Sequence, residues 1–164
     1  MTTVELATVD DLGALVEIFN HYVATSKSNF DARLATIDER RQWFAKFSST
    51  GPYRLVVARR DGKVLGSASS SPYRDHAAFR ETVEFGVSLH AEHLGQGLGS
   101  LLYSALIESL VNEPVHVALA GIALPNDASV ALHRKFGFTE VGIFRDYAIK
   151  DGEYISSVWM QRVL

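Results

Sequence analysis

The stretch that most constrains this chain is residues 82–103, where an alternating strand pattern runs through three spaced glycines into an amphipathic helix pattern. The glycines are Gly95, Gly97 and Gly99. Glycine adopts backbone angles that a Cβ forbids, so successive N–H groups of such a loop can turn toward one point. The first turn of the following helix adds unpaired N–H donors and the positive end of its dipole. The stretch therefore predicts an anion-binding loop between a strand and a helix.

Two common phosphate-binding loops do not fit these residues. A Walker loop ends in Gly-Lys followed by Ser or Thr, and a dinucleotide-binding loop needs a third glycine where Ser100 stands. Two interpretations remain. The loop binds a pyrophosphate in another way, or it is a flexible turn whose small residues allow close packing.

Composition favours one domain with a small-molecule ligand. The chain has 164 residues, 47% of them hydrophobic, and a formal net charge of -3. A single domain over residues 1–164 with a well-developed core is expected at this size. A nucleic-acid surface would need a basic stripe, and the sequence has none. We therefore expect no nucleic-acid partner.

Cysteine usage and hydropathy bear on the compartment. The chain has no cysteine, which excludes disulfides, a thiol nucleophile and cysteine metal sites and fits a reducing cytoplasm. No apolar run approaches the roughly 20 residues that span a bilayer. The first residues lack the apolar core of a secretion signal. The sequence therefore predicts a cytoplasmic protein with no membrane partner.

Hydrophobic periodicity predicts an irregular order of strands and helices. Asp10 or Asp11 is the expected cap of the first helix, and the capping box Thr36-Ile-Asp-Glu39 starts the second. Asp61-Gly62 and Asp151-Gly152 are typical hairpin turns. The expected elements are strand 4–7, helices 12–23 and 36–47, strands 53–59, 63–70 and 82–89, helix 99–112, strand 114–122, helix 126–136, and strands 138–149 and 154–163. This order is α+β in character.

The glycine stretch resembles a known cofactor loop. Leu94-Gly-Gln-Gly-Leu-Gly99 is similar to the [Gln/Arg]-x-x-Gly-x-[Gly/Ala] loop with which GCN5-related N-acetyltransferases hold coenzyme A. Leu94 departs from the family, which usually has Gln or Arg there. A second signature lies in residues 124–138, where Asn126 resembles the asparagine that contacts the pantetheine or pyrophosphate arm. Asn126 is equally suited to be a helix N-cap, and the two uses are compatible.

The order of elements matches this family over nearly the whole chain. The resemblance implies its fold, an α+β (α/β three-layer) domain with a mixed, mostly antiparallel central sheet flanked by helices. It implies acetyl-CoA as the co-substrate and no metal. The coenzyme A contacts it implies are Leu89, Leu94, Gly95, Gln96, Gly97, Leu98, Gly99, Ser100, Asn126 and Ser129.

Four segments are similar to the branch that acetylates phosphinothricin and methionine sulfoximine. They are Asn20-His-Tyr-Val23, Ser28-Asn-Phe30, Thr82-Val-Glu84 and Leu124-Pro-Asn-Asp127. The chain departs from that branch at Asp31 and His76, where arginine is usual, and at Phe79, where tyrosine is usual. These departures remove cationic and hydroxyl groups, which would change the choice of substrate. The candidate acceptor contacts are Phe30, Tyr73 and His76.

The branch also forms two-fold dimers, which implies a homodimer here. Trp43, Phe44 and Phe47 form an apolar helix face that a second copy could cover. The alternative is that this face packs in the chain's own core.

Glu84 is the candidate general base. A protonated amine must lose a proton before it can attack a thioester. The apolar odd positions of strand 83–89 point Glu84 to the opposite face, beside the strand end that leads into the glycine loop. The resemblance gives the glutamate of Thr-Val-Glu the same role. The alternative is a solvated glutamate on an open sheet face.

His133 is the second candidate catalytic residue. It stands where many family members carry the tyrosine of Asn-x-x-[Ala/Ser]-x-x-Leu-Tyr, and the phosphinothricin branch also has histidine there. Histidine can donate or accept near pH 7, so it could act as acid, second base or orienting group. The alternative is a helix-surface histidine with no role. His90 and His93 flank the loop, but without a third ligand they make a poor zinc site.

The sequence therefore predicts an acetyl-CoA-dependent N-acetyltransferase that acts on the free amine of a small amino-acid-like substrate, of the phosphinothricin or methionine sulfoximine type. Direct attack in a ternary complex is expected, because a chain without cysteine cannot form an acetyl-cysteine intermediate. Two alternatives stay open. One is a non-catalytic acyl-CoA-binding module, and the other is an acetyltransferase that acts on a protein amine.

Overall fold

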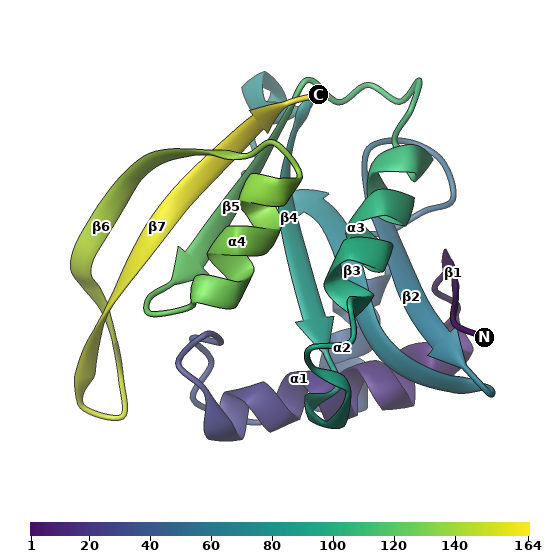
Figure 1. Cartoon of the computed structure of the whole chain (residues 1–164), viewed down its shortest axis with the longest axis horizontal. Helices are drawn as coiled ribbons and strands as arrows, with labels where there is room; N and C mark the ends of the chain where they lie inside the picture. Colours follow the sequence, from purple (N-terminus) through teal and green to yellow (C-terminus); the bar gives the residue numbers. More distant parts are fainter.

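The fold is built on a seven-stranded mixed sheet with helices on both faces (Figure 1). The computed structural model describes all of residues 1–164. The elements in chain order are β1 (Thr3–Leu6), α1 (Leu12–Thr25), α2 (Ile37–Phe44), β2 (Arg54–Arg60), β3 (Lys63–Pro72), β4 (Thr82–Leu89), α3 (Leu98–Ser109), β5 (Val117–Ala123), α4 (Asp127–Lys135), β6 (Thr139–Lys150) and β7 (Glu153–Val163). This confirms the predicted α+β class and the mostly antiparallel sheet.

The strands lie in the order β1-β2-β3-β4-β5-β7-β6. Every neighbouring pair is antiparallel except β4 and β5. These two parallel strands pair only from Thr82 to Glu84 with Val117 to Leu119. Beyond Glu84 they diverge, and Figure 1 shows them separating toward the N-terminal end of α3. The centre of the sheet therefore opens at the carboxyl ends of its two parallel strands.

Alternation along the strands divides the core into two layers. Val56 and Ala58 belong to the large cluster that contains the apolar side of α3, whereas Leu55 and Val57 belong to a smaller cluster with Leu15 of α1. Trp43, Phe44 and Phe47 are half-buried against this smaller cluster. The alternative given for these aromatics, packing in the chain's own core, is therefore what the structure shows.

Several predicted boundaries differ from the structure. Helix α2 ends at Phe44, so Phe47 lies beyond it. Asp11 does not cap α1 through its side chain; its carboxylate accepts the Thr8 backbone N–H at 2.9 Å and an Arg59 N–H at 2.7 Å. Three short 3-10 turns, Val9–Asp11, Ala77–Phe79 and Ala91–His93, were not predicted, because single turns leave no periodic signal.

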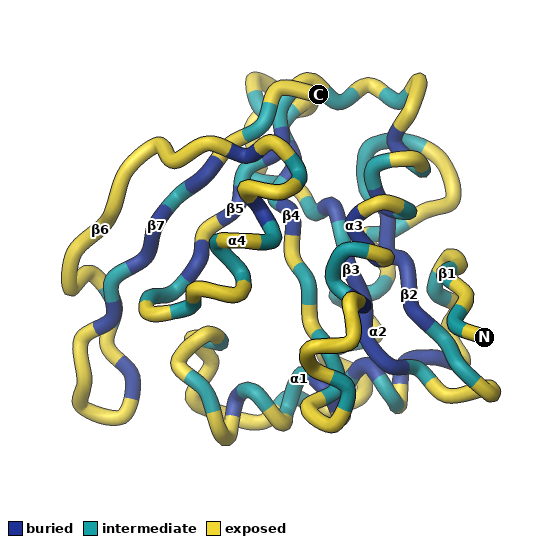
Figure 2. The backbone as a smooth tube through the Cα atoms, in the orientation of Figure 1, coloured by how far each residue is buried: buried dark blue, intermediate teal, exposed yellow.

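Exposure is unevenly distributed over the sheet. Figure 2 shows buried residues in the central strands, while β6 at one edge is exposed almost throughout.

None of the helices combines the length and hydrophobicity that a membrane crossing requires.

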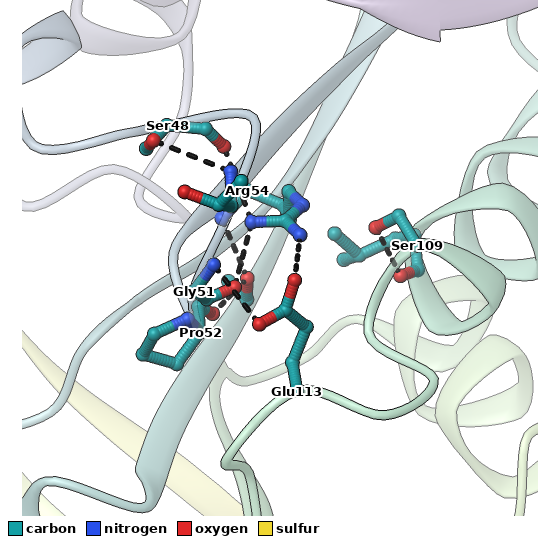
Figure 3. Close-up of polar contacts among 9 residues, drawn as sticks. Ser48, Gly51, Pro52, Arg54, Ser109 and Glu113 are labelled. Carbon is teal, nitrogen blue, oxygen red and sulfur yellow. Dashed lines mark hydrogen bonds and ion pairs between the residues drawn. The ribbon is translucent and has the colours of Figure 1, made fainter.

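A buried ion pair joins the first residue of β2 to the loop after α3 (Figure 3). The Arg54 side chain is 5% exposed and its Nη2 donates to Oε1 of Glu113. Arg54 Nη1 donates to the Gly51 carbonyl at 2.6 Å, and Glu113 Oε2 accepts the Gly51 N–H at 3.0 Å. The carboxylate thus compensates a cation that would otherwise be buried alone.

We expect Glu113→Gln to lower the free energy of unfolding by about 3 kcal/mol, because the Arg54 guanidinium loses its counter-charge. Urea denaturation followed by circular dichroism measures this change. Glu140→Gln is the matched control, since Glu140 pairs with Arg134 on the surface at 3.9 Å and should change stability by less than about 0.5 kcal/mol. Equal effects of the two substitutions would contradict a stabilising role for the buried pair.

Candidate active site

The divergence of β4 and β5 opens one large cavity of about 1020 Å³. Its walls come from the two diverging strand ends, the glycine loop, α3, α4 and the end of α1 with the loop that follows. Beyond Glu84 the facing edges of β4 and β5 do not pair with each other, so their backbone N–H and C=O groups are available. An extended ligand that carries amides can pair with such edges.

The glycine loop has the predicted backbone geometry at two of its three glycines. Gly95 and Gly97 adopt φ of 72° and 77°, and Gly97 is the N-cap of α3. A Cβ on Gly97 would meet no heavy atom within 4 Å, so the space beside its backbone is open. Gly99 differs, because it lies in the first turn of α3 and its Cβ would come within 3.1 Å of Leu132. The prediction that Gly99 supplies a special backbone conformation is therefore wrong; it allows α3 to pack against α4.

Several positive groups converge at this end of the cavity. The first-turn N–H groups of α3, from Leu98 to Ser100, have no acceptor within the helix. Lys135, at the end of α4, donates from Nζ to the Ser100 hydroxyl at 2.8 Å and lines the same cavity. A pyrophosphate fits this set, since it would meet free N–H donors, a helix dipole and a lysine ammonium.

Asn126 and Ser129 lie on the cavity wall at the start of α4. The Asn126 side-chain oxygen accepts the Ser129 backbone N–H at 3.2 Å, so Asn126 is the N-cap that the sequence indicates. Its amide nitrogen keeps its donors free for a ligand. Both uses of Asn126 thus remain compatible with the structure.

Glu84 also lines the cavity, immediately before the point where β4 leaves β5. Its neighbours Val83 and Phe85 are buried on the face that packs with α3, so the carboxylate lies on the other face. Glu84 is half-buried and has no hydrogen-bond or ion-pair partner within the chain. Burial raises the pKa of this carboxyl above its ordinary value of 4.5.

His133 is 3% exposed and both of its ring nitrogens are engaged. Nδ1 lies 2.7 Å from the Ser129 carbonyl, which can only accept, so the proton is on Nδ1. Nε2 then accepts from the Tyr103 hydroxyl at 2.8 Å. Burial lowers the pKa of His133, partly opposed by the Ser129 carbonyl, and burial raises the pKa of Tyr103. The pair is therefore neutral, and the alternative of a surface histidine is wrong.

The three predicted acceptor contacts are not on the cavity wall. Phe30 is exposed and its ring centroid lies 6.1 Å from that of Tyr147. Tyr73 and His76 form a separate aromatic group with Phe79, whose ring centroid lies 5.3 Å from that of Tyr73 and 6.3 Å from that of His76. Gln96 is exposed beside Arg60 and is likewise outside the wall, whereas the other predicted cofactor contacts line it.

His90 and His93 have one further potential ligand nearby, Glu92, but it lies exposed on the same turn and not on a second element that would fix its position. Ligand atoms of His90, Glu92 and His93 lie within 4.8 Å of one another. All three come from one exposed or half-exposed turn outside the cavity wall, and His90 Nδ1 already accepts the Glu92 N–H at 3.3 Å.

Sequence reasoning missed several residues of the wall. Lys135 and Tyr103 carry no local signal, because their partners lie about 30 residues away in the sequence. Tyr22 donates to the Leu89 carbonyl at 2.6 Å and holds the end of β4 on α1. The wall also includes residues 25–29, of which only Ser28 and Asn29 belong to a segment that the sequence analysis names.

Comparison with known proteins agrees with this geometry. The sequence profile described as "Acetyltransferase (GNAT) family" matches residues 15–138. A phosphinothricin N-acetyltransferase of Streptomyces coelicolor is 43% identical, over 94% of this chain and 92% of that protein. An L-methionine sulfoximine/L-methionine sulfone acetyltransferase of Salmonella typhimurium is 35% identical, over 97% and 92%. A Salmonella typhimurium structure solved with its cofactor acetyl-CoA superimposes with a TM-score of 0.95 at 34% identity, covering 100% of this chain and 94% of that one.

The cavity between diverging parallel strands, the glycine loop at the start of α3 and the match over three quarters of the sequence lead to one assignment. This chain belongs to the Acetyltransferase (GNAT) family and is an N-acetyltransferase.

Proposed function

We propose that this enzyme transfers acetyl from acetyl-CoA to the free amine of a small amino-acid-like substrate, of the phosphinothricin or methionine sulfoximine type. The observation that carries the proposal is the position of Glu84, an unpaired, half-buried carboxylate in the same cavity as the anion-binding loop. The names of the two relatives support this class of acceptor. Departures at Asp31, His76 and Phe79 leave the individual amine to be found by experiment.

In this proposal, the residues at one end of the cavity bind acetyl-CoA, and Glu84 acts on the amine. Acetyl-CoA supplies the acetyl thioester when bound. The N–H groups at Gly97 to Ser100 and the Lys135 ammonium hold the pyrophosphate, and the open edges of β4 and β5 pair with the amide-bearing arm. Other residues of the cavity wall, which include Leu89, Leu94 and Asn126, enclose this arm.

Glu84 removes the proton that blocks the amine. The carboxylate takes a proton from the ammonium, directly or through water, and frees the nitrogen lone pair. The C–N bond then forms at the thioester carbonyl while the C–S bond breaks and the sulfur leaves as thiolate. The second proton of the nitrogen passes to this thiolate or to water, which gives the neutral amide and coenzyme A. With a pKa of about 8.5, a thiol is a tolerable leaving group at neutral pH. The transfer is direct, since the chain has no cysteine to carry the acetyl group.

Of the three roles considered for His133, orientation fits the geometry best. Both ring nitrogens are engaged and the ring is neutral, so it has no proton ready to give to a thiolate. It instead fixes the Tyr103 hydroxyl on the cavity wall. We further propose that the enzyme works in the cytoplasm, which agrees with the absence of cysteine.

Thiol release from acetyl-CoA, screened over free amino acids, methionine sulfoximine, phosphinothricin, polyamines and a lysine-containing peptide, tests the proposal. Turnover with the amino-acid analogues supports it. Turnover with the peptide alone would favour a protein acceptor, and tight acetyl-CoA binding without turnover would favour a binding module.

We expect Glu84→Gln to lower kcat by about 10² while the dissociation constant for acetyl-CoA stays within about twofold. Because burial raises the Glu84 pKa, the wild-type kcat/KM falls as the pH drops through that raised value, and the variant lacks this acidic limb. The variant should recover partly at alkaline pH, where more amine is already deprotonated. Steady-state pH profiles measure these effects.

Stability provides the control for this substitution. The fold favours protonated Glu84, so ionisation lowers stability as the pH rises through its folded pKa; the Gln variant should melt about 1–3 °C higher at pH 7. His133→Phe should reduce kcat less than Glu84→Gln. A wild-type rate for Glu84→Gln across the pH range would remove Glu84 from the mechanism, and a larger loss at His133 would reverse the two roles.

The second test concerns the glycine loop. Gly97→Val should weaken acetyl-CoA binding at least about tenfold, because its side chain would occupy the space where a pyrophosphate approaches the backbone. Gly62→Val is a matched control, since Gly62 has a φ of 78°, equally open surroundings and no place on the cavity wall. Isothermal calorimetry measures the affinities. Equal acetyl-CoA affinity in the two folded variants would overturn the assignment of the loop.

We also propose a homodimer. Its interface is formed by other residues than Trp43, Phe44 and Phe47, which pack in the core of the chain itself. Edge strand β6, which Figure 2 shows exposed along nearly all of its length, has a row of exposed apolar side chains and one unpaired backbone edge. Soluble proteins normally cover such an edge. The row comprises Val141, Ile143, Phe144, Tyr147 and Ile149. A second copy can cover it through a two-fold axis that pairs like with like.

Light scattering at micromolar concentration should therefore give twice the 18.1 kDa of one chain. Phe144→Asp should shift the mass toward the monomer, because it places a charge within the apolar row. Val111→Asp is the control, as Val111 is equally exposed but lies beyond α3, away from β6. A monomeric wild-type protein would contradict the dimer.

A further inference from the structure

Lys150, the last residue of β6, is a buried cation that the proposed mechanism does not use. The residue is only 5% exposed, although Ile149 before it and Asp151 after it are exposed. No carboxylate pairs with it. Its charge must therefore be compensated by other groups, because an uncompensated buried ammonium is strongly destabilising.

Three backbone carbonyls provide this compensation. Lys150 Nζ donates to the carbonyl oxygens of Val23 at 2.8 Å, Ser26 at 2.8 Å and Asn29 at 2.7 Å. These bonds use all three donors of the ammonium group. The Val23 carbonyl belongs to the last turn of α1, where unpaired carbonyls and the negative end of the helix dipole favour a cation.

The three carbonyls span the segment that closes one wall of the cavity. Residues 25–29 line the cavity, so Lys150 fixes the backbone two residues before this wall, within it and at its end. The segment has no regular secondary structure after α1, and its side-chain bonds, such as Ser26 to Ser28, are local. The β6–β7 hairpin, which carries Lys150, makes a second contact with this segment through the ion pair of Lys27 with Glu153. This pair is exposed to solvent and therefore weak.

We propose that Lys150 is a positioning residue, which holds the wall formed by residues 25–29 in the conformation that receives the acceptor amine. The inference rests on the proposed function. Groups that bind a pyrophosphate lie at the glycine loop and Lys135, on other elements, so this wall is left to the acceptor. Lys150 reaches the cavity only through the carbonyls that it orders and contacts neither substrate.

Lys150→Met tests this role, because it removes the three donors and the charge while it keeps an unbranched side chain. We expect the KM for the acceptor to rise about tenfold or more, with a smaller change in kcat and an acetyl-CoA affinity within about twofold of wild type. Trypsin should also cut faster after Lys27, since the segment loses its buried anchor.

Glu153→Gln is the matched control. It breaks the exposed tie from the same hairpin, leaves Lys27 available to trypsin, and should change acceptor KM and cleavage rate by less than about twofold. Lys150→Arg retains the charge and several donors, so it should restore part of both losses. If Lys150→Met does not fold, Lys150→Gln takes its place, because it also removes the charge: an acceptor KM and a Lys27 cleavage rate equal to wild type in Lys150→Gln would then overturn the proposal.

The two proposals fail in different ways. A wild-type enzyme that releases no thiol with any amine would refute the proposed function, while the cleavage rate at Lys27 still reports whether Lys150 holds the segment. A wild-type enzyme that is active, with a folded Lys150→Met variant of unchanged acceptor KM and unchanged Lys27 cleavage, would refute the role of Lys150 alone.

Discussion

The structure depends on how briefly β4 and β5 pair. Three residues of each strand are in register, from Thr82 and from Val117, and then the strands part. If β4 and β5 paired along their full length, the N–H and C=O groups on their facing edges would all be hydrogen-bonded, and no cavity would lie between the two strands. The short pairing instead leaves two strand edges free, places Glu84 at the branching point and opens the cavity toward the start of α3. The positions proposed for the cofactor arm, the anion site and the base thus all depend on one interruption in the hydrogen-bond ladder.

This interruption requires support from outside the sheet. Tyr22 of α1 holds the Leu89 carbonyl at the free end of β4, and Gly99 lets α3 pack closely on Leu132 of α4 beside β5. The end of β4 is therefore tied to α1, and the two helices that flank the cavity, α3 and α4, pack against each other. A rigid opening of this kind is preorganised, so little conformational entropy has to be lost when a ligand enters.

The sequence was sufficient for features that are local in the chain. The loop from Gly95 to Ser100, the N-cap at Asn126 and the alternation that turns Glu84 away from the core were all predictable from spacing. The acceptor side was not: Phe30, Tyr73 and His76 came from likeness to relatives and lie off the cavity wall. Lys135 and Lys150 have partners about 35 and more than 120 residues away, and only tertiary packing brings such groups together.

Three charged side chains, two of them buried and one half-buried, show how the fold separates stability from chemistry. Arg54 is compensated by a carboxylate, and Lys150 by three carbonyl dipoles, so both charges are satisfied within the chain. Glu84 has neither kind of partner, and burial alone raises its pKa. An unpaired carboxylate reduces stability where it is ionised, yet its proton affinity is higher than that of a salt-bridged one. The one charge of the three that the chain leaves unpaired is therefore the charge that we propose takes a proton from the substrate.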